Sequence, residues 1–151
     1  WPFANAYEVT ARFHAGDVPG ALELFQRYIR AHSEIGCDTL SEMFHADGRI
    51  PLMSNGNLLS FCHAWGAQAS WALQRYLLGI YPLAVGWSRF AVHPLISPLK
   101  WVRGKVNTPL GLIEVELETT SRGMKGKVTY PSALQAAADF VPPDAIELQK
   151  K

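Results

Sequence analysis

The chain has 151 residues, of which 48% are hydrophobic and 18% charged, and its formal net charge is +1. This composition supports one or two packed domains and excludes wholesale disorder, while the near-neutral charge argues against a nucleic-acid-binding surface. No apolar stretch approaches the ~20 residues that cross a membrane. The chain begins Trp1-Pro2-Phe3, without an initiator Met or a signal peptide. We therefore expect a piece of a larger protein, and localisation stays open between cytoplasmic and secreted.

The first part of the chain has helical periodicity. A helix is predicted from Ala4 to His14, and its buried stripe consists of Ala6, Val9 and Phe13. A second helix is predicted from Ala21 to Ser33, with an inner face made of Leu22, Phe25 and Ile29. Asp17 is its expected N-cap, Pro19 fits its first turn, and Gly36 is expected to end it. The two helices should form an antiparallel hairpin.

A long irregular segment from Cys37 to Leu58 follows. A loop of about twenty residues is uncommon in a compact domain, and such loops are usually functional or disordered. This loop contains several apolar side chains and is therefore expected to be packed: Met43, Phe44, Ile50, Leu52 and Met53. Cys37 and Cys62 have no metal-site spacing, and we expect two unpaired buried thiols, with a disulfide left as the alternative.

The next segment, Leu59 to Gly79, has the longest helical periodicity in the sequence. Its predicted buried stripe consists of Cys62, Trp65, Ala69, Leu73 and Tyr76. After Gly79 the period becomes two. Strands are predicted at residues 89–93, 100–106, 112–118, 125–130 and 134–141. The clearest strand, residues 112–118, alternates apolar side chains with three glutamates, which we interpret as a solvated face rather than a catalytic row. These strands predict antiparallel sheets in a sandwich-like module.

Few catalytic motifs are present. The sequence has no glycine-rich phosphate loop, no G-x-S-x-G and no H-E-x-x-H, and its five histidines are scattered. No metal or cofactor is predicted. What remains is a group of carboxylates, histidine and aromatics around the long loop, and glycosidic bonds are commonly cleaved by two carboxyl groups. Glu42 is the candidate catalytic residue, with capping of a turn near Thr39 as the alternative; His63 and Trp65 are candidate sugar contacts or ordinary packed residues.

Five segments in order resemble one enzyme family. They are G-C-D-T-L-S-E at 36–42, N-L-L-S-F-C-H-A-W-G-A at 57–67, R-Y-L-L-G-I-Y-P at 75–82, R-F-A-V-H-P at 89–94 and L-K-W-V-R-G-K-V-N-T-P-L-G at 99–111. Together they resemble the C-terminal part of the inverting α-L-rhamnosidases of glycoside hydrolase family 78. The resemblance implies an α+β chain in segregated halves. Residues 1–82 would be the last helices of an (α/α)6, or six-hairpin, barrel, residues 83–143 a small antiparallel β-sandwich, and residues 144–151 a tail.

The resemblance also assigns roles to residues. Glu42 matches the general base that activates water, and His63 matches a histidine that contacts the sugar; Trp65 lies in the same motif. The general acid would lie upstream of residue 1, so the 151-residue fragment alone is expected to be inactive. The family usually has an aromatic residue where this chain has Ser41, and often Trp-Asp or a similar pair where it has Phe44-His45.

The implied function is hydrolysis of terminal α-L-rhamnosides with inversion. The partners would be a carbohydrate substrate and the upstream part of the same polypeptide, with no nucleic acid and no membrane. Two alternatives stay open: the same fold acting on another glycoside, as Ser41 suggests, and a non-catalytic carbohydrate-binding or scaffold relative.

Overall fold

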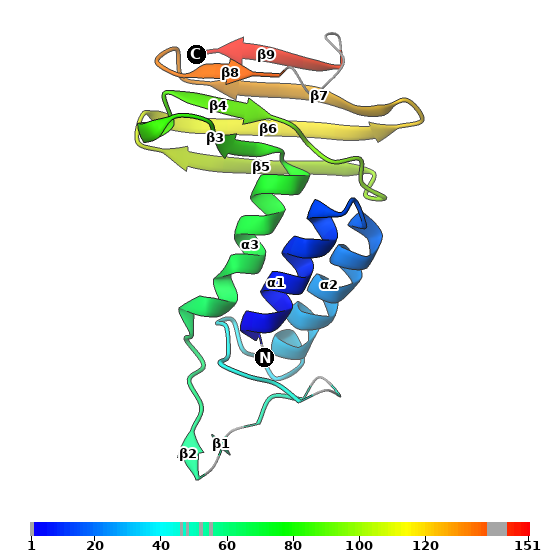
Figure 1. Cartoon of the computed structure of the whole chain (residues 1–151), viewed down its shortest axis with the longest axis vertical. Coiled ribbons are helices and arrows are strands. Elements are labelled where there is room, and N and C mark those ends of the chain that lie inside the picture. Colours follow the sequence, from blue (N-terminus) through cyan, green and yellow to red (C-terminus); the bar gives the residue numbers. More distant parts are fainter. Residues whose placement is uncertain (1, 46, 48, 52, 55, 139–144) are drawn as a thin grey trace. The chain divides into compact units, whose positions relative to one another are not determined.

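The structure is a computed structural model that describes residues 2–45, 47, 49–51, 53–54, 56–138 and 145–151. The chain divides into two compact units, Trp1–Ala72 and Leu73–Lys151. Figure 1 shows the helices and irregular segments of the first unit and the strands of the second. This division falls ten residues before the boundary predicted at residues 82/83. No helix in the described ranges is long and apolar enough to cross a membrane.

Two packed helices open the first unit, as the periodicity predicts. Helix α1 spans Pro2–His14 and helix α2 spans Val18–Glu34. The predicted stripe of α1 is confirmed, because Ala6, Val9 and Phe13 are at most 2% exposed. On α2 the prediction of Ile29 as an inner residue is wrong, since its side chain is 38% exposed. The buried residues are Val18, Ala21, Leu22, Tyr28, Ala31 and His32. Two of them contact the following loop, Tyr28 through Phe44 and His32 through Ser41.

Both ends of α2 have the caps expected from the sequence. The Asp17 carboxylate accepts a hydrogen bond from the Gly20 N–H at 3.0 Å, and Pro19 occupies the first turn. At the other end the Gly36 N–H donates to the Ser33 carbonyl and the Cys37 N–H donates to the His32 carbonyl. This pair of bonds is a Schellman motif, and Gly36 has the left-handed conformation that the motif requires (φ 68°).

The long loop contains one short antiparallel hairpin, formed by β1 (Met53–Ser54) and β2 (Asn57–Leu58). Ile50 is buried within the loop, and Met43 and Phe44 are half-buried, in agreement with a packed loop. Met53, in contrast, is 52% exposed. Leu52 lies outside the described residues.

The predicted helix from Leu59 to Gly79 is shorter than expected. Residues 59–63 are not helical; the helix begins with a 3-10 turn, η1 (Ala64–Ala67), continues as α3 (Gln68–Ala72) and ends as the π-helical η2 (Leu73–Leu77). The predicted stripe is also wrong at its start, because Cys62 is exposed and Trp65 is 38% exposed. Leu73 and Tyr76 are half-buried, and the side chain of Ala69 is not among those described. The buried residues are Gly66, Ala72 and Leu77.

The described residues of the second unit form two sheets. The smaller sheet has the order β3-β4-β8 and is formed by Ile80–Pro82, Arg89–Val92 and Gln135–Ala137, with a 3-10 turn, η3 (Val85–Trp87), between β3 and β4. The larger sheet has the order β5-β6-β7-β9 and is formed by Trp101–Thr108, Gly111–Thr120, Gly123–Tyr130 and Ile146–Lys150. The predicted strand at residues 134–141 is thus only three residues long in the described part, and residues 139–141 lie outside it.

Two features of these sheets differ from the prediction. Strands β4 and β8 are parallel, as are β7 and β9, so the sheets are mixed rather than antiparallel. The segment expected to be a tail contains β9, which pairs with β7 along five residues. Its alternation of Ile146 with polar residues is too short to stand out from the sequence alone, and β7 supplies the partner that orders it.

The core of the second unit lies between the two sheets. Ile113, Val115 and Leu117 of β6 are at most 1% exposed, which confirms their predicted inward orientation. The ring of Phe90 on β4 meets that of Tyr130 on β7 edge to face, with 5.3 Å between centroids. This contact joins the two sheets and is consistent with a small β-sandwich.

Candidate functional site

The backbone brings the two sequence-predicted segments, around Glu42 and around His63, side by side. The Glu42 N–H donates to the Ser60 carbonyl at 2.8 Å, and the His63 N–H donates to the Leu40 carbonyl at 2.8 Å. The Thr39 hydroxyl also donates to the carbonyl of Phe61. Because these bonds hold residues 60–63 in a non-helical conformation, the helix starts only at Ala64. The structure therefore places Glu42 and His63 on neighbouring segments, which periodicity alone does not reveal.

The Glu42 side chain is half-buried. One carboxylate oxygen, Oε2, lies 3.5 Å from the Ser60 nitrogen, which is a long and weak contact. Within the described ranges no cation lies within ion-pair distance of Glu42. A carboxylate that is partly shielded but not neutralised can accept a proton from water, which is the requirement for a general base.

A buried histidine on α2 supports the segment that carries Glu42. His32 is 3% exposed and Ser41 is fully buried. The Ser41 N–H donates to His32 Nε2 at 2.9 Å, and the Ser41 hydroxyl lies 2.9 Å from the same nitrogen. On the other side of the ring, Nδ1 lies 2.8 Å from the Tyr28 carbonyl, which can only accept. Nδ1 therefore carries the proton and Nε2 is the acceptor that fixes Ser41 next to Glu42.

This arrangement gives Ser41 a structural role that the sequence does not reveal. Its side chain points into the protein, where its hydroxyl can donate its single proton either to His32 Nε2 at 2.9 Å or to the Met43 carbonyl at 3.1 Å. A large aromatic side chain in the same orientation would occupy the space of the His32 ring. The signal for His32 in the sequence is weak: a histidine one helical turn after Tyr28, on the face that proves to be buried.

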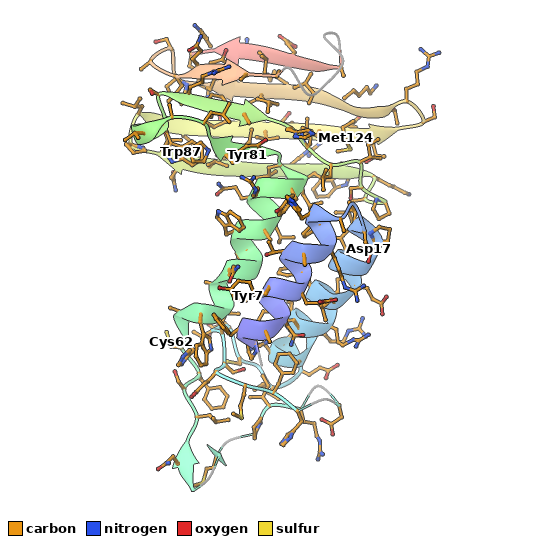
Figure 2. All side chains as sticks on the ribbon, viewed as in Figure 1. Tyr7, Asp17, Cys62, Tyr81, Trp87 and Met124 are labelled. Carbon is orange, nitrogen blue, oxygen red and sulfur yellow. The ribbon has the colours of Figure 1, made fainter. Side chains whose placement is uncertain are left out.

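Four aromatic rings lie together next to these segments, and we call them the aromatic cluster: Phe3, Tyr7, His63 and Trp65. The rings of His63 and Trp65 are 4.2 Å apart, those of Trp65 and Phe3 are 5.4 Å apart, and those of Phe3 and Tyr7 are 4.9 Å apart. Phe3, Tyr7 and Trp65 are 39%, 54% and 38% exposed. Figure 2 labels Tyr7 on α1. Exposed aromatic faces are suited to contact with sugar rings.

The sequence prediction missed Phe3 and Tyr7. Their i, i+4 spacing places them on one face of α1, beside the buried stripe, and this spacing was the available signal. Two further predictions concern the cysteines and a metal site. Cys37 and Cys62 are both free, but neither is buried as predicted: Cys37 is half-buried and Cys62 is exposed. No group of three or more metal-ligating side chains occurs among the residues that the structure describes.

Tyr28 has a buried hydroxyl for which the described residues supply no hydrogen-bond partner. Burial raises the pKa of Tyr28 to about 12. Replacing Tyr28 by Phe removes the unsatisfied hydroxyl and is expected to raise the free energy of unfolding by about 1 kcal/mol at neutral pH. Because the pKa of Tyr28 is higher in the folded than in the unfolded protein, the wild type keeps its full stability below pH 10. The free energy of unfolding of the wild type falls as the pH rises from 10 toward 12, because the unfolded tyrosine ionises first, and Tyr28→Phe does not show this loss.

Denaturant unfolding of the wild type and of Tyr28→Phe between pH 7 and pH 11.5 measures both effects. The difference between the two proteins should grow above pH 10, and Tyr7→Phe, at an exposed position, is the matched control. A loss of stability in Tyr28→Phe at neutral pH would show that the hydroxyl has a favourable partner.

His32→Leu tests the support of Ser41. The leucine leaves the Ser41 N–H without its buried acceptor, whereas the Ser41 hydroxyl keeps the Met43 carbonyl, so we expect the free energy of unfolding to fall by about 1–3 kcal/mol. His32→Gln retains an acceptor and should restore part of the loss, whereas His14→Leu, at an exposed position on α1, should have little effect. Equal losses in His32→Leu and His32→Gln would contradict the role of the acceptor and indicate packing alone.

The first unit thus places a loop carboxylate near a histidine and exposed aromatic rings, and the second unit contains two packed sheets. Comparison with known proteins identifies the relationship. Residues 79–145 match the family described as the bacterial alpha-L-rhamnosidase C-terminal domain. An alpha-L-rhamnosidase of Alteromonas sp. (strain LOR) is 34% identical over 82 residues, which cover 54% of this chain and 9% of the relative.

A solved structure extends the similarity to the helical unit. The crystal structure of a GH78 family rhamnosidase of Bacillus sp. GL1 matches 99% of this chain and 16% of its own, with 28% sequence identity and a TM-score of 0.72. The chain is thus related to the C-terminal part of the family 78 α-L-rhamnosidases, as the sequence motifs indicate. It spans only 9% and 16% of the lengths of these two relatives.

Proposed function

We propose that this chain forms the C-terminal part of an inverting α-L-rhamnosidase in which Glu42 is the general base. The main support is the match to a family 78 rhamnosidase over 99% of the chain, because it includes the segments around Glu42 and His63 as well as the β-sandwich unit. The half-buried carboxylate of Glu42, held next to the His63 segment by two backbone hydrogen bonds, is suited to this role.

In the proposed reaction Glu42 removes a proton from a water molecule that attacks the anomeric carbon. The glycosidic oxygen leaves on the opposite side of the sugar and is protonated by a carboxylic acid outside this chain. For inversion the two carboxyl groups should be about 6.5–9.5 Å apart, so that the water fits between Glu42 and the sugar. His63 would contact the sugar, and the exposed ring of Trp65 would provide an apolar face beside it.

We further propose that residues 1–82 contribute the last helices of an (α/α)6 barrel and that residues 83–143 belong to the sandwich domain. Several large apolar side chains of the helical unit are exposed: Phe3, Tyr7, Ile29, Ile35, Trp65 and Trp71. Earlier helices of the barrel would cover part of this surface. Since those helices would also supply the acid, the 151 residues alone are expected to have no hydrolase activity.

The proposal is tested by assaying a protein that contains this chain and its upstream barrel against aryl glycosides of several sugars. We expect the highest kcat/KM for the α-L-rhamnoside and no turnover by the 151 residues alone. Ser41, which replaces the usual aromatic, favours one alternative, a different deoxy-sugar, which would appear as a higher kcat/KM for that glycoside. Absence of turnover with every glycoside would contradict the enzyme assignment and favour the non-catalytic alternative.

A further inference from the structure

The outward face of the larger sheet carries charged side chains in cross-strand register. Arg103 on β5 is paired with Glu116 on β6, Glu116 with Lys127 on β7, and Lys127 with Glu147 on β9. A row of alternating positive and negative groups therefore crosses all four strands, which we call the charged row. Neighbouring strands are separated by about 4.8 Å, so donors and acceptors alternate at that interval.

The side chains of the charged row do not form ion pairs with one another within the described ranges. The ion pairs of this face in the described ranges involve Glu114, which contacts Lys105 at 3.3 Å and also Lys151. None of the four members of the charged row has an ion-pair or hydrogen-bond partner for its side chain within the same ranges. The Arg103 guanidinium instead lies over the ring of Trp101, 5.3 Å from its centroid. The polar atoms of the row are therefore available to a ligand.

Two adjoining hollows lie along this row. One has a volume of about 470 Å³ and is lined mainly by Arg103, Glu116, Glu118, Lys125, Lys127 and Glu147. The other, of about 400 Å³, shares Arg103, Glu116 and Lys127 and extends to Lys105, Glu114 and Thr129. Both volumes fall in the range of small-molecule sites. Their shared residues make them one continuous polar depression across the strands.

An exposed tryptophan flanks the depression. Trp101 is 58% exposed and pairs in register with Glu118, which lines the larger hollow. Because side chains alternate along a strand, Trp101 faces the same side as Arg103. The depression thus combines an apolar ring face at one end with alternating donors and acceptors along its length.

We propose that this face is a binding site for a neutral oligosaccharide, separate from the candidate catalytic segment. A sugar hydroxyl both donates and accepts, so it can bridge a carboxylate and a neighbouring cation, and a sugar ring can lie against Trp101. The lining cations Arg103, Lys105, Lys125 and Lys127 are balanced by four glutamates: Glu114, Glu116, Glu118 and Glu147. An anionic ligand would meet a carboxylate beside every cation that it approached, and this balance favours an uncharged ligand.

The test is an NMR titration of the 151-residue chain with xylohexaose, cellohexaose and maltohexaose, and with hexagalacturonate as the acidic comparison. We expect at least one neutral hexasaccharide to shift the amide signals of β5, β6 and β7. Its dissociation constant should change little between 50 and 500 mM salt, because an uncharged ligand forms no ion pair that salt could screen. Trp101→Ala should weaken this binding by about tenfold, the loss of one stacked ring. Trp71→Ala, at an exposed tryptophan of the helical unit, should not change it.

Three results would overturn the proposal: no shift with any neutral hexasaccharide up to about 10 mM, tighter and salt-sensitive binding of hexagalacturonate, or equal affinity in Trp101→Ala and the wild type. Circular dichroism of each variant establishes that it is folded. Because the site does not involve Glu42, its failure would leave the proposed hydrolase unaffected, and the converse also holds.

Discussion

Glu42→Gln is expected to lower the kcat of aryl α-L-rhamnoside hydrolysis by about 10²–10⁴-fold in a protein that contains this chain and its upstream barrel. Glutamine has nearly the same shape and retains an oxygen that can accept the weak contact from Ser60, but it cannot take a proton from the attacking water. The KM should change little, because the base acts in the transition state rather than in substrate binding. Steady-state kinetics with an aryl rhamnoside measures both constants.

Two controls make this result specific. Glu34→Gln changes an exposed carboxylate at the end of α2 and should leave the kinetics unchanged. Added azide, a small nucleophile that needs no base, is expected to restore part of the turnover of Glu42→Gln. If Glu42→Gln retains near-normal kcat, Glu42 is not the base, whatever sugar the protein uses.

Gly79→Ala is expected to lower the free energy of unfolding by about 3–5 kcal/mol. Gly79 ends the helical segment with φ 70°, a conformation that costs a residue with a Cβ free energy. A Cβ at this position would also collide with the backbone of His93 and Pro94, which cannot rotate away. The same backbone is fixed by the His93 N–H, which donates to the Gly79 carbonyl at 2.8 Å.

Gly86 provides a matched control for this substitution. It has φ 67°, and a Cβ there would meet no atom within 4 Å. Gly86→Ala should therefore lower the free energy of unfolding by only about 1 kcal/mol, the cost of the left-handed backbone for alanine. The difference between the two variants measures the cost of the collision at Gly79. Chemical denaturation of both variants gives the comparison. Equal losses would show that the chain relaxes around the added methyl group.

Local patterns predicted the regular elements well. Three features follow from side-chain chemistry within a few residues: the buried stripe of α1, the Asp17 cap and the end of α2 at Gly36. The structure confirms all three. The alternation of Ile113, Val115 and Leu117 likewise needs only the period of a strand. These features depend on interactions between residues that are close in the sequence, and such interactions can be predicted from the sequence alone.

Features that depend on distant partners were missed. Residues 59–63 have helical spacing, yet they are not helical, because the Ser60 carbonyl accepts from the Glu42 N–H and the His63 N–H donates to the Leu40 carbonyl; no local signal predicts that pairing. The parallel pairing of β9 with β7 has the same origin. In the candidate site, the family resemblance supplied Glu42 and His63, but the contact of His32 with Ser41 required the fold. The aromatic cluster also requires the fold, because Phe3 and Trp65 are far apart in the sequence and their rings meet only in the folded chain.

The central proposal is that Glu42 delivers water to the face of the sugar opposite the leaving group. Proton NMR during the first minutes of aryl α-L-rhamnoside hydrolysis, by the protein that contains this chain and its upstream barrel, tests it most directly. The β-anomer of rhamnose should appear first and convert to the equilibrium mixture by mutarotation. Initial formation of the α-anomer would contradict the account, because it would require a covalent intermediate and a nucleophile rather than a base.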